Sequence, residues 1–307
     1  MKIITVKDIV HKFSFKVLAG HDQLHRPLIH NKVRRPGLEF MDKFDFITTG
    51  YVQILGKNEI NYLHTLEDEE CRLRIGNIVK YNPPCIIITS NQEEPLGLIQ
   101  YCVAEKIPVL QTPDSTSVLS AKLDAYVMKG MAEEIAIHGV CVNVAGMGIL
   151  LRGKSGVGKS ETAHTLIGRG HRLVADDIVV LKKLSPQTLL GTHNEKNKEF
   201  LALRSIGLLN VVRLYGRASF QEETRIALDI ELTKWEQNDL NNELELETKF
   251  TDYMGVQIPH IQIQLQPGRD VAGLIEAAAN NWYLKQQGYS AAEDFVQRLE
   301  KDFDNSN

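Results

Sequence analysis

The sequence predicts an α/β protein with two domains. The chain has 307 residues, about twice the roughly 150 residues of an average domain. Short β-type runs alternate with helical patterns in its first part, which is typical of a parallel α/β layer. Further along, a glycine-rich loop stands between an apolar strand pattern and a helical pattern. We therefore expect an N-terminal α/β domain over residues 1–130 and a second domain, which carries this loop, over residues 131–307.

Three strands and three helices are expected in the first domain. The strands are the short apolar runs Val52–Leu55, Cys85–Thr89 and Pro108–Gln111. The helices are the segments with helical spacing, Glu70–Val79, Gly97–Glu105 and Ser117–Glu134. No catalytic motif is readable in this half, and its histidines lack the spacing of metal ligands, so the sequence assigns it no chemistry.

A β-hairpin is expected to open the second domain. Its strands are Gly139–Ala145 and Gly148–Leu151, joined by a tight turn that contains two glycines. Near the end of the chain, apolar residues at helical spacing predict a helix over Val271–Trp282. After a Gly-Tyr-Ser break, a second helix through Phe295 and Leu299 is expected to close the domain.

Composition and charge exclude several classes of protein. Lys and Arg number 35 against 39 Asp and Glu, a net charge of −4, which argues against a nucleic-acid-coating protein. No apolar run approaches the roughly 20 residues of a membrane span, and the first residues lack the pattern of a signal peptide. Four cysteines without paired spacing are expected to be reduced and buried, as in a cytoplasmic protein: Cys71, Cys85, Cys102 and Cys141.

The strongest motif in the chain is a phosphate-binding loop that matches GxxxxGK[ST] at every fixed position. It consists of Gly153, Lys154, Ser155, Gly156, Val157, Gly158, Lys159 and Ser160. An apolar strand precedes it and the helical pattern Glu161–Arg169 follows, which is the context that the motif requires. In such a loop backbone N–H groups surround the phosphates, while Lys159 would reach the β- and γ-phosphates and Ser160 would ligate Mg²⁺.

Two adjacent carboxylates follow within the β-type run Leu173–Val180. Near a phosphate-binding loop, one such group commonly holds Mg²⁺ through water, and a second can accept the proton of an attacking hydroxyl. Alternation along a strand would let only one of Asp176 and Asp177 face the phosphates. The alternative is that the pair forms only a turn between strands. His138, just before the hairpin, is a candidate third group.

The motifs together resemble the HPr kinase/phosphorylase family. No NKxD motif follows residue 160, and a hairpin precedes the loop, so neither a GTPase nor a doubly wound NTPase is indicated. The central resemblance lies in Ile137–Gly148, Gly153–Ala163 and Arg169–Asp177. It extends over nearly the whole chain through Arg35–Glu39, Ser205–Gly216, Gln266–Asn281 and Leu284–Phe295.

This resemblance implies an enzyme of carbon catabolite regulation with two activities. It would phosphorylate a serine of the phosphocarrier protein HPr with ATP or pyrophosphate and Mg²⁺, and remove that phosphate with inorganic phosphate. The family's catalytic domain is related to phosphoenolpyruvate carboxykinase, and its members resemble homohexamers. By this resemblance Lys159 holds the β-phosphate and Ser160 is a metal ligand. Asp177 is the catalytic base, and the acid in reverse, with His138 beside it. Asp176, from the carboxylate pair, is expected as a second metal ligand.

Three positions depart from the family pattern. Ala202 stands where the family has a metal-binding glutamate, Glu243 where it has a catalytic arginine, and Gln266 where it has the first arginine of PVRPGR. An arginine that stabilises a phosphoryl transition state is worth about 10³–10⁵ in rate. We expect nucleotide binding to survive, kinase activity to weaken and phosphorolysis to suffer most. The alternatives are a divergent nucleotide-binding regulator without useful catalysis and a kinase that acts on another substrate.

Overall fold

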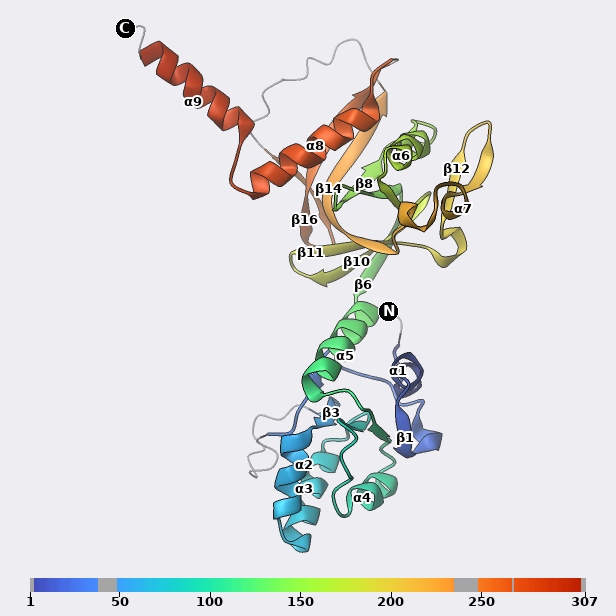
Figure 1. Ribbon diagram of the computed structural model, residues 1–307, viewed down its shortest axis with the longest axis vertical. Coiled ribbons are helices and arrows are strands. Elements are labelled where there is room, and N and C mark those ends of the chain that lie inside the picture. The colour runs from blue at the N-terminus through green and yellow to red at the C-terminus, as the bar shows by residue number, and fades with distance from the viewer. Residues whose placement is uncertain (1–2, 38–48, 235–247, 267, 305–307) are drawn as a thin grey trace. The chain divides into compact units, whose positions relative to one another are not determined.

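The computed structural model describes residues 3–37, 49–234, 248–266 and 268–304. The chain forms two compact units, Met1–Ala132 and Glu133–Asn307, and both combine helices with β-sheet (Figure 1). The expected boundary lay between residues 130 and 131. Within the described ranges, no helix has the length and apolar character needed to cross a membrane.

The first unit is a five-stranded sheet with helices on both faces. The strand order is β1-β5-β4-β3-β2, in which β1 is antiparallel and the others run parallel. Its strands are β1 (Lys16–Ala19), β2 (Val33–Arg34), β3 (Val52–Leu55), β4 (Ile86–Ile88) and β5 (Val109–Gln111). Its helices are α1 (Val6–Phe13), α2 (Lys57–Thr65), α3 (Asp68–Lys80), α4 (Leu98–Ala104) and α5 (Thr116–Met131). Apolar side chains of α2, α3 and α4 fill the core on one face, and those of α1 and α5 fill the core on the other.

The three strands and three helices expected in this unit are present, but α1, α2, β1 and β2 were missed. The start of α1 has a local signal, because the Thr5 hydroxyl accepts from the Asp8 N–H and the Asp8 carboxylate accepts from the Thr5 N–H. The expected end of α5 at Glu134 was wrong. This helix ends at Met131, and Glu134 lies on a strand of the second unit, paired with Lys182.

The second unit is built on a nine-stranded mixed sheet. The strand order is β6-β10-β11-β14-β8-β7-β9, with β16 beside β14 and β15 beside β16. Its first strands are β6 (Glu133–His138), β7 (Val140–Val144), β8 (Met147–Arg152), β9 (Arg172–Ala175), β10 (Ile178–Ser185) and β11 (Thr188–His193). The later strands are β14 (Glu223–Lys234), β15 (Lys249–Tyr253) and β16 (Val256–Leu265), and a separate hairpin joins β12 (Phe200–Leu203) and β13 (Gly207–Asn210). Strands β8, β14 and β16 run parallel to one another.

Helices cover one face of this sheet. They are α6 (Lys159–Gly168), α7 (Val211–Tyr215) and α8 (Val271–Gln286), and α9 (Ala291–Asp304) follows them in the chain. Residues of α6 and α8 share one apolar core with β7, β8 and β14, and Figure 1 shows α8 crossing β14 and β16. This packing holds β8 and α6, the two elements that flank the phosphate-binding loop, in a fixed arrangement.

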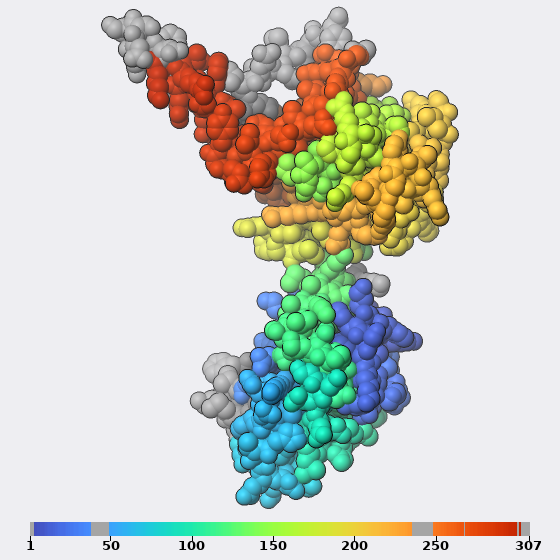
Figure 2. Space-filling view, viewed as in Figure 1, coloured from blue at the N-terminus to red at the C-terminus, as the bar shows by residue number. Residues whose placement is uncertain are grey.

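The expected hairpin is confirmed as β7 and β8, although its turn lies one residue earlier. Ala145 and Gly146 both have positive φ, 51° and 92°, as a type I′ turn requires, and Met147 already belongs to β8. Both C-terminal helices are also confirmed. However, α9 does not close the domain: it stands off from the sheet in Figures 1 and 2, and Phe295 is 49% exposed.

The expectation of one β-run through Leu173–Val180 was wrong. The run is broken at Asp176 and Asp177 into β9 and β10, and Asp177 has a φ of 67° in the left-handed region. A short turn of this kind is tolerated by aspartate, whose side chain can bond locally. Strand alternation therefore does not govern the directions of the two carboxylates.

The four cysteines are free and buried, as expected: Cys71, Cys85, Cys102 and Cys141.

Candidate active site

The phosphate-binding loop connects the end of β8 to the start of α6. Gly153 is required here for steric reasons, because a Cβ at this position would lie 2.3 Å from the carbonyl oxygen of Leu232 on β14. Gly158, with φ 110°, precedes the first residue of α6, Lys159. The loop thus passes tightly over β14 and presents backbone N–H groups and a helix N-terminus, the arrangement that binds phosphate groups.

The ammonium group of Lys159 bends back over this loop. Its Nζ donates to the carbonyl oxygen of Gly153 at 3.0 Å and to that of Lys154 at 3.2 Å. Both contacts are to neutral acceptors, so a phosphate oxygen is a stronger partner for this cation. Lys159 is therefore placed to exchange these carbonyls for phosphate.

Ser160 and Asp176 lie in direct contact. Ser160 Oγ donates to Asp176 Oδ1 at 2.8 Å, and the Ala202 N–H of β12 donates to Asp176 Oδ2 at 2.9 Å. The Asp176 residue is 4% exposed, and this burial raises the pKa of its carboxyl group, against the lowering effect of the two hydrogen bonds. Because the Asp176 carboxylate is removed from water, a nearby cation would stabilise its charged form.

These two side chains fit a magnesium ion. A serine hydroxyl and a carboxylate are hard oxygen ligands, and Mg²⁺ keeps several waters while binding one or two protein groups and substrate phosphates. In the part of the chain that the structure describes, no cluster of three or more His, Cys, Asp or Glu residues could hold a metal by itself. The arrangement thus suits a metal that arrives with a phosphorylated ligand.

Asp177 and His138 form an exposed pair on the other side of the same turn. His138 Nδ1 lies 3.6 Å from Asp177 Oδ1, and the two side chains are 86% and 66% exposed. The Gly139 N–H also donates to the carbonyl oxygen of Asp177 at 3.1 Å. This hydrogen bond connects the turn to the residue just before β7. A carboxylate held this way is open to an incoming macromolecule.

One cavity of 640 Å³ brings these groups together. Among the residues singled out from the sequence, those that line it are Gly153, Ser155, Gly156, Lys159, Ser160, Asp176, Asp177, His138 and Ala202. Lys154, Val157 and Gly158 belong to the loop but do not line this cavity. The sequence reading missed Asn197, Phe200 and Leu208, which line it from the polar segment before β12 and from the β12–β13 hairpin. No motif points to Asn197 or Phe200, whereas Leu208 lies in the Ser205–Gly216 segment of the family resemblance. The β12–β13 hairpin is a separate two-stranded sheet, and the Ala202 N–H joins it to Asp176.

The three departures from the family pattern lie in different places. Ala202 lines the cavity beside Asp176, so its methyl group stands where the family pattern has a glutamate. Gln266 is exposed just after β16. Glu243 lies outside the described residues.

The comparisons with known proteins agree on one family. A family model described as HPr Serine kinase N terminus matches residues 4–127, and another described as HPr Serine kinase C-terminal domain matches residues 129–299. A protein of Oceanobacillus iheyensis named "Putative HPr kinase/phosphorylase 2" is 64% identical over 300 residues, 98% of each chain. The HPr kinase/phosphorylase of Bacillus cytotoxicus is 36% identical over 299 residues, 97% of each chain.

Among solved structures, the Hpr(Ser) kinase/phosphatase from Coxiella burnetii matches 52% of this chain and 98% of its own. The sequence identity is 30% and the TM-score is 0.47. The two family models together span residues 4–127 and 129–299, and the two curated relatives match 98% and 97% of the chain. The chain therefore belongs to the HPr kinase/phosphorylase family.

Proposed function

We propose that this protein transfers a phosphoryl group from ATP or pyrophosphate to a serine of HPr, and removes it again with inorganic phosphate. The observation that carries the proposal is the single cavity lined by the loop, by Lys159, by the Ser160–Asp176 pair and by Asp177. A phosphate-binding loop, a metal-binding pair and a free carboxylate are the parts that phosphoryl transfer to a hydroxyl requires.

In the forward direction, Asp177 accepts the proton of the serine hydroxyl while the serine oxygen bonds to the γ-phosphorus. The bond from that phosphorus to the bridging oxygen breaks, and ADP leaves; with pyrophosphate as donor, phosphate leaves. Lys159 leaves its two carbonyl partners and holds the phosphates, while the loop N–H groups stabilise the charge that develops on their oxygens. Ser160 and Asp176 would hold Mg²⁺, which neutralises phosphate charge when bound.

In the reverse direction, an oxygen of inorganic phosphate attacks the phosphoserine phosphorus. The bond from phosphorus to the serine oxygen breaks, Asp177 returns the proton, and pyrophosphate forms. His138 is a positioning residue here: its Nδ1 lies 3.6 Å from Asp177 Oδ1, which is close enough to hold the direction of this carboxylate.

The physiological setting follows from the family. The proposal includes HPr as the partner, a role in carbon catabolite regulation and a cytoplasmic location. It also includes a homohexamer and a catalytic fold related to phosphoenolpyruvate carboxykinase. Its support is the full-length similarity to proteins named HPr kinase/phosphorylase. Neither a nucleic acid nor a membrane is part of it.

The test is a transfer assay with purified protein, HPr, Mg²⁺ and [γ-³²P]ATP, followed by phosphoserine-HPr with inorganic phosphate. We expect labelled HPr in the first reaction and pyrophosphate in the second. Lys159→Ala is the matched control, because it removes the phosphate-binding cation from the loop and should abolish both products. An inactive wild-type protein that binds ATP would overturn the enzymatic proposal.

A second candidate function is a nucleotide-binding regulator without useful transfer. It is favoured by Ala202, whose methyl group lies beside the metal-binding pair where the family pattern has a glutamate. Glu243, which stands where the family pattern has a catalytic arginine, also favours this candidate. For this candidate we expect Mg–ATP binding without labelled HPr, and a rise in transfer when Ala202→Glu and Glu243→Arg are combined.

A further inference from the structure

A smaller cavity lies next to the phosphate-binding loop. Its volume is 250 Å³, and it is lined by Lys154 and Val157 of the loop and by the final residues of β14, together with Gln262 of β16. Strands β8, β14 and β16 run parallel, so their carboxyl ends meet at this edge of the sheet. In open α/β sheets, ligands bind outside the carboxyl ends of parallel strands.

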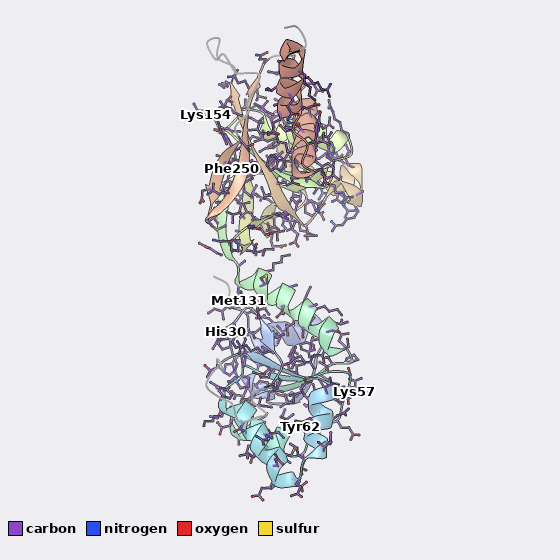
Figure 3. All side chains as sticks on the ribbon, turned by 90° about the vertical axis from the view of Figure 1, so that its left-hand side faces the viewer. His30, Lys57, Tyr62, Met131, Lys154 and Phe250 are labelled. Carbon is purple, nitrogen blue, oxygen red and sulfur yellow. The ribbon has the colours of Figure 1, made fainter. Side chains whose placement is uncertain are left out.

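The loop itself separates this cavity from the larger one. Ser155 and Gly156 line the larger cavity, whereas Lys154 and Val157 line the smaller one. The Lys154 carbonyl accepts from Lys159 Nζ at 3.2 Å on the phosphate side. The Lys154 side chain is exposed, and Figure 3 labels Lys154 on the same side of the unit as Phe250. A ligand whose phosphates bind at the loop in the larger cavity can therefore extend across the loop, so that its other end lies in the smaller cavity.

The walls of this cavity combine hydrogen-bonding groups with an apolar surface. Gln262 Nε2 donates to Thr233 Oγ1 at 3.3 Å, and Glu231 pairs in register with Gln262 on the neighbouring strand. An amide and a hydroxyl offer both donors and acceptors to the edge of a planar base, and a carboxylate at a strand end accepts from ribose hydroxyls. Val157 and the methylene stem of Lys154 supply apolar area for the face of the base.

The geometry points to this cavity as the binding site for the nucleoside part of ATP. The inference rests on the proposed function, because it takes the phosphates to be held by the loop in the larger cavity. A volume of 250 Å³ is just below the roughly 300–1,000 Å³ of typical ligand pockets, as suits one part of a ligand. ATP then uses both cavities, whereas pyrophosphate uses only the larger one.

The experiment compares the two donors by isothermal titration calorimetry of the full chain with Mg²⁺. Gln262→Ala removes the amide and should weaken Mg–ATP binding about tenfold, since a polar contact to a bound ligand is lost. Glu231→Gln should weaken it by a similar factor. Pyrophosphate binding should stay within about twofold of wild type in both variants, which also shows that they fold. Gln257→Ala, an exposed glutamine on the same strand, is the matched control and should change neither affinity.

Two results would overturn the nucleoside site. In the first, both variants bind Mg–ATP as tightly as wild type. In the second, ATP and pyrophosphate binding fall by the same factor. A failure of the proposed function has a different signature: wild-type protein binds neither donor, or Lys159→Ala binds both as tightly as wild type. In that case the phosphate site itself is wrong, and the nucleoside site falls with it.

Discussion

Ser160 Oγ donates a hydrogen bond of 2.8 Å to Asp176 Oδ1, and this contact joins the phosphate-binding loop to the turn between β9 and β10. The second oxygen of the same carboxylate accepts from the Ala202 N–H at 2.9 Å. Three segments distant in sequence thus converge on one buried carboxylate. The Ser160–Asp176 pair, the loop and the β12–β13 hairpin are therefore in structural contact.

Asp176→Asn is expected to remove most of the Mg²⁺ dependence of ATP binding. The substitution keeps the size of the side chain but removes the charge that faces the cation. We expect the affinity for Mg²⁺ in the presence of ATP to fall by at least tenfold, measured by titration of Mg²⁺ at fixed ATP. Asp252→Asn, at an exposed aspartate of β15, is the control. Equal Mg²⁺ affinities in wild type and Asp176→Asn would show that this carboxylate does not face the metal.

Ala202→Glu is expected to strengthen metal binding and to raise the rate of transfer to HPr about tenfold. The new carboxylate would start from a residue that lines the cavity and whose N–H already contacts Asp176. Ala202→Gln is the matched control, because it adds the same length without the charge. A rate increase of the same size in both variants would mean that side-chain volume, and not charge, is responsible.

Asp229→Asn is expected to destabilise the second unit by about 3 kcal/mol. The Asp229 side chain is 0% exposed and accepts from Arg152 Nε at 2.6 Å, so its loss leaves the arginine without its carboxylate. Arg152 directly precedes Gly153, so phosphate binding should weaken as well. Denaturant unfolding measures the first effect and pyrophosphate titration the second. Asp252→Asn should cost less than 1 kcal/mol. The account is contradicted if the two variants unfold at the same denaturant concentration.

Glu222 is expected to make stability depend on pH between about 5 and 2. The Lys198 ammonium at 2.8 Å, with His193, lowers the pKa of Glu222 from 4.5 to about 2. A lowered pKa stabilises the fold above 4.5, and this contribution is lost as the pH falls towards 2. Because the side chain is 47% exposed, solvent screening limits the effect to about 1 kcal/mol.

Denaturant unfolding of wild type and Glu222→Gln at pH 5.5 and 3.5 checks this expectation. The variant should lose less stability than wild type between the two pH values. Glu293→Gln, at an exposed glutamate in the first turn of α9, should behave like wild type. If Glu222→Gln and wild type respond identically to pH, the Lys198 contact contributes nothing.

Local signals explain which parts of the fold could be predicted. The loop from Gly153 to Ser160, the β7–β8 hairpin and the helices α8 and α9 each depend on neighbouring residues in the sequence. The loop glycines with positive φ (Gly153, Gly156 and Gly158), an apolar strand before the loop and helical periodicity after it are visible in the chain itself. These elements were found with errors of a few residues at their ends.

Long-range pairing explains what could not be predicted. Strand β6 has the sequence Glu133–His138, which alternates weakly, and it exists because it pairs with β10. The buried Asp176 carboxylate accepts from the N–H of Ala202, 26 residues away in the sequence. Asn197, Phe200 and Leu208 lie on or just before the β12–β13 hairpin, which this contact joins to the turn at Asp176. The break between β9 and β10 was only the alternative prediction, because apolar residues flank both carboxylates.

The central claim, that this cavity transfers a phosphoryl group with Asp177 as the base, is tested most directly by Asp177→Asn. The measurement is the single-turnover rate of label transfer from [γ-³²P]ATP to HPr, together with the Mg–ATP affinity of the same preparation. We predict an affinity within about threefold of wild type and a transfer rate lower by about 10²–10⁴. Equal transfer rates in wild type and Asp177→Asn would contradict the account.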